Sequence, residues 1–167
     1  MKNILAATAT LLALAVPTPA LADSYKQINE FVNLIEKTGT DVVSADCKKD
    51  FQVENAHGFY LFDKEEEIDH LVICKDTVAQ DDPEAIWETL AHEATHVMQH
   101  CLGGPIINDS HVPRMLRNLK AVAPHYYEIL QEYDSDKKRI EIEAFDMELQ
   151  DPQEVVNTFK YFCFSDN

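Results

Sequence analysis

The chain has 167 residues, a formal net charge of −16 and a hydrophobic fraction of 46%. This length fits one domain, and the hydrophobic fraction is enough for a core, which excludes a wholly disordered chain. The acidity excludes generic binding to phosphate backbones, so no nucleic-acid partner is expected, and it disfavours anionic membrane surfaces.

The first 22 residues have the three parts of a secretory signal peptide. Lys2 supplies a positive start, residues 4–16 are apolar and uncharged, and Ala20-Leu21-Ala22 is a small-x-small cleavage site. Thirteen apolar residues are too few for a span of about 20, which argues against a retained membrane anchor. The sequence therefore predicts cleavage after Ala22 and an exported protein (periplasmic, lumenal or secreted), with a single domain over residues 23–167 and no stable membrane insertion.

A helix and a small sheet are predicted next. Apolar residues recur at helical spacing over Tyr25–Lys37. Two short runs, Gly58–Phe62 and His70–Cys74, are rich in aromatic and β-branched residues, and the polar stretch between them suggests a hairpin. Asp41–Val43 is a candidate edge strand.

The rest of the chain is predicted to be helical. Asp82 and Pro83 have the character of an N-cap and a first helical residue, and Gly103 follows the end of the helix near Cys101. Further helices are expected near residues 112–122, 124–133, 136–150 and 152–161. The predicted fold class is α+β, with an N-terminal helix, a small antiparallel sheet and a helical bundle.

Four cysteines remain after the predicted cleavage. An even number in an exported chain indicates two disulfides. Three pairings are open, and Cys47–Cys74 with Cys101–Cys163 is favoured because each pair can link neighbouring elements. A zinc-thiolate site is disfavoured because the chain has no C-x-x-C pair.

The helix that begins at Pro83 contains His92-Glu93-Ala94-Thr95-His96, an H-E-x-x-H motif. Residues four apart lie one turn apart on a helix, so both imidazoles can reach one ion, and Glu93 can act as a base without being a ligand. Such a motif arises by chance in roughly 3% of chains of this composition, so its context matters. The two histidines lie opposite the apolar face of the helix, which favours a Zn²⁺ site over core histidines.

A catalytic zinc needs a third protein ligand. The metzincin pattern fails because positions 99 and 102 are Gln and Leu. Glu143 is the favoured ligand because it flanks the apolar stripe of its helix, where a carboxylate needs a partner. Two alternatives remain: Glu141, which is predicted to lie on the surface near Glu148, and His100, which continues the i, i+4 series of the motif. Asp146 could hold a ligand histidine through its free N–H.

An H-E-x-x-H helix followed by a helix with a Glu before Ala resembles the gluzincin group of zinc metallopeptidases, in a small, minimal form. The resemblance covers about residues 58–149. It implies that His92, His96 and Glu143 bind zinc and that Glu93 is the catalytic base. The chain departs from thermolysin-like members at Met147, where they have Asp four residues after the ligand Glu.

The function expected from these features is an exported zinc metallopeptidase that hydrolyses a peptide or protein substrate. A donor that stabilises the oxyanion could come from a residue after the motif, although a structural role is favoured for each of the candidates His111, His125, Tyr126, Tyr127 and Tyr133. The edge strand of the hairpin could pair with an extended peptide. The main alternative is an exported, non-catalytic binding protein with a structural or vestigial zinc, closed by a fourth ligand such as His100. A disulfide-linked interaction domain without metal is a third possibility.

Overall fold

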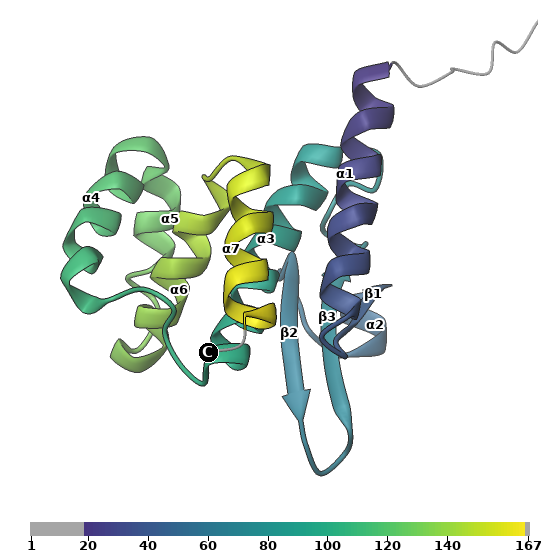
Figure 1. Cartoon of the computed structure of the whole chain (residues 1–167), viewed down its shortest axis with the longest axis horizontal. Helices are drawn as coiled ribbons and strands as arrows, with labels where there is room; N and C mark the ends of the chain where they lie inside the picture. Colours follow the sequence, from purple (N-terminus) through teal and green to yellow (C-terminus); the bar gives the residue numbers. More distant parts are fainter. Residues whose placement is uncertain (1–18, 166–167) are drawn as a thin grey trace, which may run out of the picture.

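A computed structural model describes residues 19–165 of the chain (Figure 1). Except for its last four residues, the predicted signal peptide lies outside them. The elements, in chain order, are α1 (Pro19–Glu36), β1 (Asp41–Ala45), α2 (Cys47–Asp50), β2 (Gly58–Asp63), β3 (Ile68–Cys74), α3 (Pro83–Leu102), the short 3₁₀ helix η1 (Asp109–His111), α4 (Val112–Val122), α5 (Pro124–Ile129), α6 (Ser135–Glu148) and α7 (Pro152–Phe164). The predicted α+β class is confirmed.

The sheet has three strands in the order β1-β3-β2. β2 and β3 form the predicted antiparallel hairpin, with Phe59 opposite Val72. β1 is the additional edge strand, but it pairs with β3 in parallel, so the sheet is mixed and not purely antiparallel. β1 can run parallel to β3 because α2, β2 and their loops separate the two strands in the chain. β2 is left as the other edge.

α3 is the central helix of the molecule. The Asp82 side chain accepts hydrogen bonds from the first backbone N–H groups of α3, and Gly103 ends the helix in the left-handed conformation with φ of 80°. The main core forms where α3 packs against α1, β3 and α7; its largest fully buried side chains include Phe31, Leu71, Leu90, Met98 and Phe159. This core holds α3 rigidly along most of its length.

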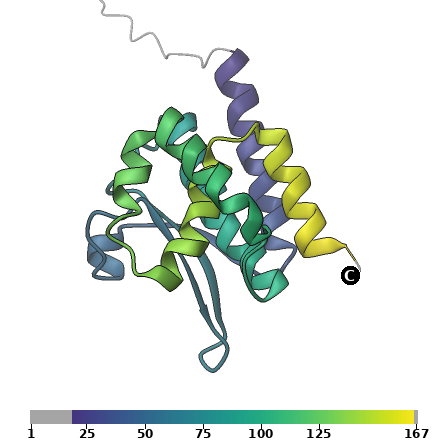
Figure 2. The same ribbon diagram turned by 90° about the vertical axis from the view of Figure 1, so that its left-hand side faces the viewer.

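α4, α5 and α6 form a second group around their own apolar cluster, made up of Met115, Leu119, Leu130, Ile142 and Phe145. Figure 1 shows this group at one end of the molecule, and in Figure 2 it faces the viewer while the β2–β3 hairpin projects away from the helices. α6 packs against α3, so the H-E-x-x-H motif lies between α6 on one side and β2 on the other.

Two disulfides connect the elements in the favoured pairing. Cys47–Cys74 links α2 to the end of β3, and Cys101–Cys163 links the end of α3 to α7. Each disulfide closes a loop of the chain. Closing such loops restricts the unfolded chain, which is a common way to stabilise a small exported domain.

No helix among residues 19–165 combines the length and hydrophobicity needed to cross a bilayer.

Candidate metal centre

α3 places His92 and His96 on one face, with ring centroids 5.1 Å apart. The sequence predicts that this face lies away from the core, but α6 and β2 cover it. Only 14% of the His92 side chain and 15% of the His96 side chain are exposed. The histidines therefore lie in a largely enclosed space between two helices, where a polar side chain needs a defined partner.

Glu141 of α6 faces both histidines. Its Oε2 lies 3.2 Å from His92 Nε2, and its Oε1 lies 3.8 Å from His96 Nε2. One ligand atom from each of these three residues lies within 4.8 Å of the others. The sequence analysis placed Glu141 on the surface beside Glu148, yet only 12% of its side chain is exposed. The two glutamates do share a face of α6, and that face is turned towards α3.

The second nitrogen of each histidine has its own partner. His92 Nδ1 lies 2.5 Å from Glu148 Oε1, and His96 Nδ1 lies 2.9 Å from Gln99 Oε1. Partners at Nδ1 orient each ring and direct Nε2 towards Glu141, as the outer groups of metal sites commonly do. Glu148 fills the role considered for Asp146, which lies instead beside Asn118 at 3.4 Å.

Glu143, the favoured ligand from the sequence, does not join the histidines and Glu141. Its side chain is fully buried, and its two oxygens accept hydrogen bonds from the backbone N–H groups of Ile106 and Ile107, from Gln99 Nε2 and from Arg139 Nη1. The expectation that a carboxylate at this position is buried and partnered was therefore correct. Its partners are an arginine one turn earlier on α6 and a loop backbone, not the two histidines.

The charges around the histidines are mainly negative. Burial alone would lower the pKa of His92, but its contacts with Glu141 and Glu148 raise it to about 10. Burial and the neighbouring His92 lower the pKa of His96. Burial opposes ionisation of Glu141, but His92 and His96 lower its pKa. The nearby carboxylates thus favour a positive charge on His92, whereas a second positive charge on His96 is disfavoured.

Glu93 lies next to the histidines on α3 and is 5% exposed. Burial raises its pKa to about 7, with His92 opposing this rise and Glu141 and Glu148 adding to it. β2 approaches Glu93 closely because residue 58 is Gly. A Cβ there would lie 2.7 Å from Val72 O and 3.0 Å from Glu93 Cγ. The strand and the motif can therefore meet only with glycine at this position.

Two cavities flank Glu93, and both are lined by His92, Gly58 and Tyr133. The larger, about 650 Å³, lies towards Glu88, Glu148, Tyr126 and Phe145. The smaller, about 510 Å³, lies towards His96, Glu141 and Lys137. Together they leave open space on both sides of Glu93.

Among the five candidate oxyanion donors, Tyr133 alone lines both cavities. Burial, with Glu141 and Glu93 adding to it, raises the pKa of Tyr133. Its phenol therefore keeps its proton at neutral pH and can donate it.

The residues fit a divalent metal. The Oε2 atom of Glu141 is buried and accepts no well-aligned hydrogen bond, although it lies 3.2 Å from His92 Nε2. A carboxylate oxygen in such surroundings is costly to bury without a further partner. Two imidazoles and one carboxylate are a ligand set typical of catalytic zinc. His100 is exposed and stacks on Phe62 with ring centroids 4.0 Å apart, so it does not close the site. Within residues 19–165, the three-ligand set has no fourth His, Cys, Asp or Glu.

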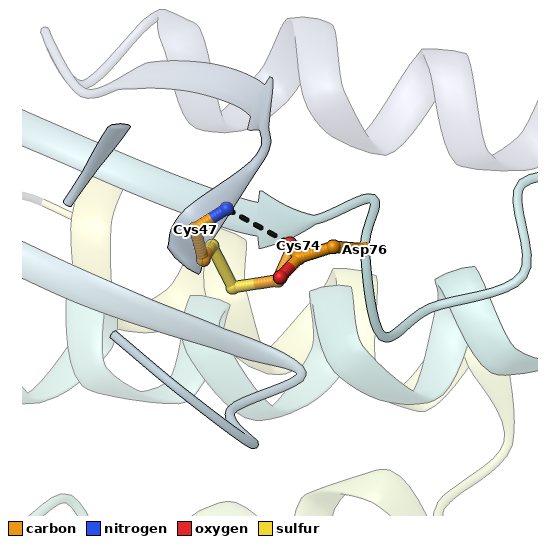
Figure 3. Close-up of side chains that lie close together, drawn as sticks. All are labelled: Cys47, Cys74 and Asp76. Atoms are coloured by element: carbon orange, nitrogen blue, oxygen red, sulfur yellow. Dashed lines mark hydrogen bonds between the residues drawn. A yellow bond between two sulfur atoms is a disulfide. The ribbon is translucent and has the colours of Figure 1, made fainter. Parts of the chain in front are cut away.

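A second close group, Cys47, Cys74 and Asp76, has a different role (Figure 3). The two sulfur atoms are bonded to each other, and Asp76 Oδ1 accepts a hydrogen bond of 2.8 Å from the backbone N–H of Cys47. Thiolate ligands are therefore missing, and the group fastens α2 to the loop after β3.

Comparisons with known proteins identify the family to which the chain belongs. No curated protein and no solved structure gives a significant match. A family model described as a domain of unknown function, DUF8637, matches residues 21–164, which include every element from α1 to α7 except the first two residues of α1. Because this match covers most of the chain, the protein belongs to the DUF8637 family.

Proposed function

We propose that this protein is an exported zinc metallopeptidase whose metal is held by His92, His96 and Glu141. The observation that carries the proposal is the convergence of three ligand atoms on one enclosed point beside Glu93. Glu141 replaces Glu143 of the sequence prediction. With this replacement the ligand set keeps the composition of the gluzincin group, two histidines of the motif and a glutamate of a later helix.

Zinc in such a site acidifies a water molecule and polarises the carbonyl group of the scissile bond. Glu93 would take a proton from that water and pass it to the departing amine nitrogen as the C–N bond breaks. Its pKa of about 7 suits a group that must first accept and then release a proton. The phenol of Tyr133 supplies a hydrogen bond to the oxygen on which negative charge develops.

The open coordination favours catalysis over the structural-zinc alternative. A structural zinc has four protein ligands, whereas the described residues offer three. His92 and Glu93 line both neighbouring cavities, which have room for a substrate. The two disulfides agree with the proposed export, because they form in oxidising compartments.

The proposal is tested with the zinc-loaded mature protein, a set of quenched fluorescent peptides and a chelator. We expect hydrolysis that the chelator abolishes and added zinc restores. Glu93→Gln should lose at least about 100-fold in kcat, in line with loss of a general base, while keeping its zinc. Full activity of a zinc-loaded Glu93→Gln protein would exclude the proposed base, and bound zinc without any hydrolysis would favour the binding-protein alternative.

A further inference from the structure

The Gln99 side chain connects Glu143 to His96 through a series of hydrogen bonds. Gln99 Nε2 donates to Glu143 Oε2 at 3.0 Å and to the carbonyl oxygen of Ile140 at 3.0 Å. The other end of the same amide, Gln99 Oε1, lies 2.9 Å from His96 Nδ1. Gln99 is only 7% exposed, so water has little access to replace these partners.

Glu143 sets the donor-to-acceptor direction of these hydrogen bonds. Its carboxylate already receives hydrogen bonds from Arg139 and from two backbone N–H groups, so it faces Gln99 as an acceptor. The Ile140 carbonyl can also only accept. Because Glu143 Oε2 and the Ile140 carbonyl oxygen are both acceptors, the NH₂ group of Gln99 must face them. If the Gln99 amide were flipped, its oxygen would face two other oxygens without a hydrogen between them.

The orientation of the Gln99 amide then determines the tautomer of the His96 ring. Because Gln99 presents its carbonyl oxygen to His96, the ring nitrogen Nδ1 must carry a hydrogen. In the neutral ring, Nε2 is then left with its lone pair, and this atom faces Glu141. A histidine can bind a metal through Nε2 only in this tautomer.

From this geometry we infer that Glu143 is a positioning residue for the proposed metal ligand His96 and acts on it through Gln99. The positioning role rests on the proposed function, because it presupposes that His96 binds zinc. The effect of Gln99 and Glu143 on the tautomer of His96 can be tested without metal. It also gives the two histidines different support, since a carboxylate holds His92 and a neutral amide holds His96.

The test uses metal-free mature protein with ¹⁵N-labelled histidine, measured by long-range ¹H–¹⁵N NMR at pH 8. An imidazole of ordinary pKa is neutral at that pH, so the spectrum reports which ring nitrogen carries the hydrogen. We expect wild-type His96 to be protonated at Nδ1. In Gln99→Leu, which removes the acceptor, the Nε2-protonated form should become populated, and zinc affinity should fall about 10- to 100-fold.

Glu143→Gln separates positioning from packing because it keeps the size of the side chain but can donate as well as accept. It should allow the Gln99 amide to flip and give His96 a mixture of the two forms. Glu148→Gln is the matched control, since Glu148 contacts His92, and it should leave the His96 spectrum unchanged.

Each outcome has a distinct meaning. An Nε2-protonated His96 in the wild type, or an unchanged His96 in Gln99→Leu, would overturn the inference. If the NMR results are as expected but wild-type protein binds no zinc, the hydrogen-bond chain stands and the proposed function fails. If zinc binds tightly and Gln99→Leu affects neither the spectrum nor the affinity, the function stands and the inference fails.

Discussion

Glu141 and Glu143 lie two residues apart on α6 and have opposite surroundings. Glu143 is fully buried and its oxygens receive hydrogen bonds from four residues. Glu141 is 12% exposed, faces two histidines and has a buried oxygen without a well-aligned hydrogen bond. Residues two apart point about 200° apart on a helix, so α6 uses one carboxylate to hold the fold and leaves the other available for an ion.

Truncating each glutamate in turn tests whether the two side chains contribute differently to the stability of the protein. Glu143→Ala should lower the free energy of unfolding by about 3–5 kcal/mol, because it leaves Arg139 and two backbone N–H groups without their acceptor. Glu141→Ala should cost the metal-free protein less, about 1–2 kcal/mol, because it removes only the contacts with His92 and His96 that lower the pKa of Glu141. Urea unfolding of both metal-free variants measures the difference, and equal losses would contradict the contrast.

The next largest effect concerns the ligand set. Glu141→Ala should weaken zinc binding by more than about 100-fold, beyond the 10- to 100-fold typical of outer groups around a metal. Competition with a chromophoric chelator gives the affinity. Glu132→Ala, which removes an exposed carboxylate, is a control expected to bind zinc like the wild type. A Glu141→Ala protein with wild-type affinity would remove Glu141 from the site.

Replacing the partner of His92 should have a smaller effect. Glu148→Gln keeps the shape of the side chain but weakens the hydrogen bond to His92 Nδ1, so zinc affinity should fall about 10-fold. Asp146→Asn is its matched control, because Asp146 lies nearby on α6 but contacts Asn118. If the control weakened binding as much as Glu148→Gln, the contact of Glu148 with His92 Nδ1 would not explain the loss of affinity.

The smallest expected effect concerns substrate preference. The larger cavity is lined by Glu88 and Glu148 and by no Lys or Arg, whereas Lys137 lines the smaller one. Peptides with one Lys or Arg next to the scissile bond should therefore be cleaved faster than matched peptides with Glu. Glu88→Gln should reduce this preference a few-fold, roughly the size of one screened charge interaction of up to about 1 kcal/mol, measured as a ratio of kcat/KM values. An unchanged ratio would show that Glu88 does not select the substrate.

Much of the fold could be predicted because local signals and the tertiary structure agree. Asp82, Pro83 and Gly103 mark the ends of α3, and two runs of aromatic and β-branched residues separated by a polar stretch mark the hairpin of β2 and β3. The parallel pairing of β1 could not be predicted, because β1 has no local feature that selects the direction of its partner. The cysteine pairing follows from elements that pack together, which the order of the chain only suggests.

The H-E-x-x-H part of the site could also be predicted, because both histidines and Glu93 lie on one helix. The third ligand lies on another helix, so its identity depends on the rotation of α6 relative to α3. One signal was available in the sequence: Arg139 precedes Glu143 by four residues, the spacing of an intrahelical ion pair. That pair gives Glu143 a partner and removes the reason to assign it to a metal.

The most direct test of the account is the metal content of purified mature protein, measured by mass spectrometry on the wild type beside Glu141→Ala and Glu143→Gln. The account predicts one zinc per chain in the wild type, none or little in Glu141→Ala, and retained but weaker binding in folded Glu143→Gln. Loss of zinc in folded Glu143→Gln with full retention in Glu141→Ala would contradict it, and so would a wild-type protein that takes up no zinc when zinc is supplied.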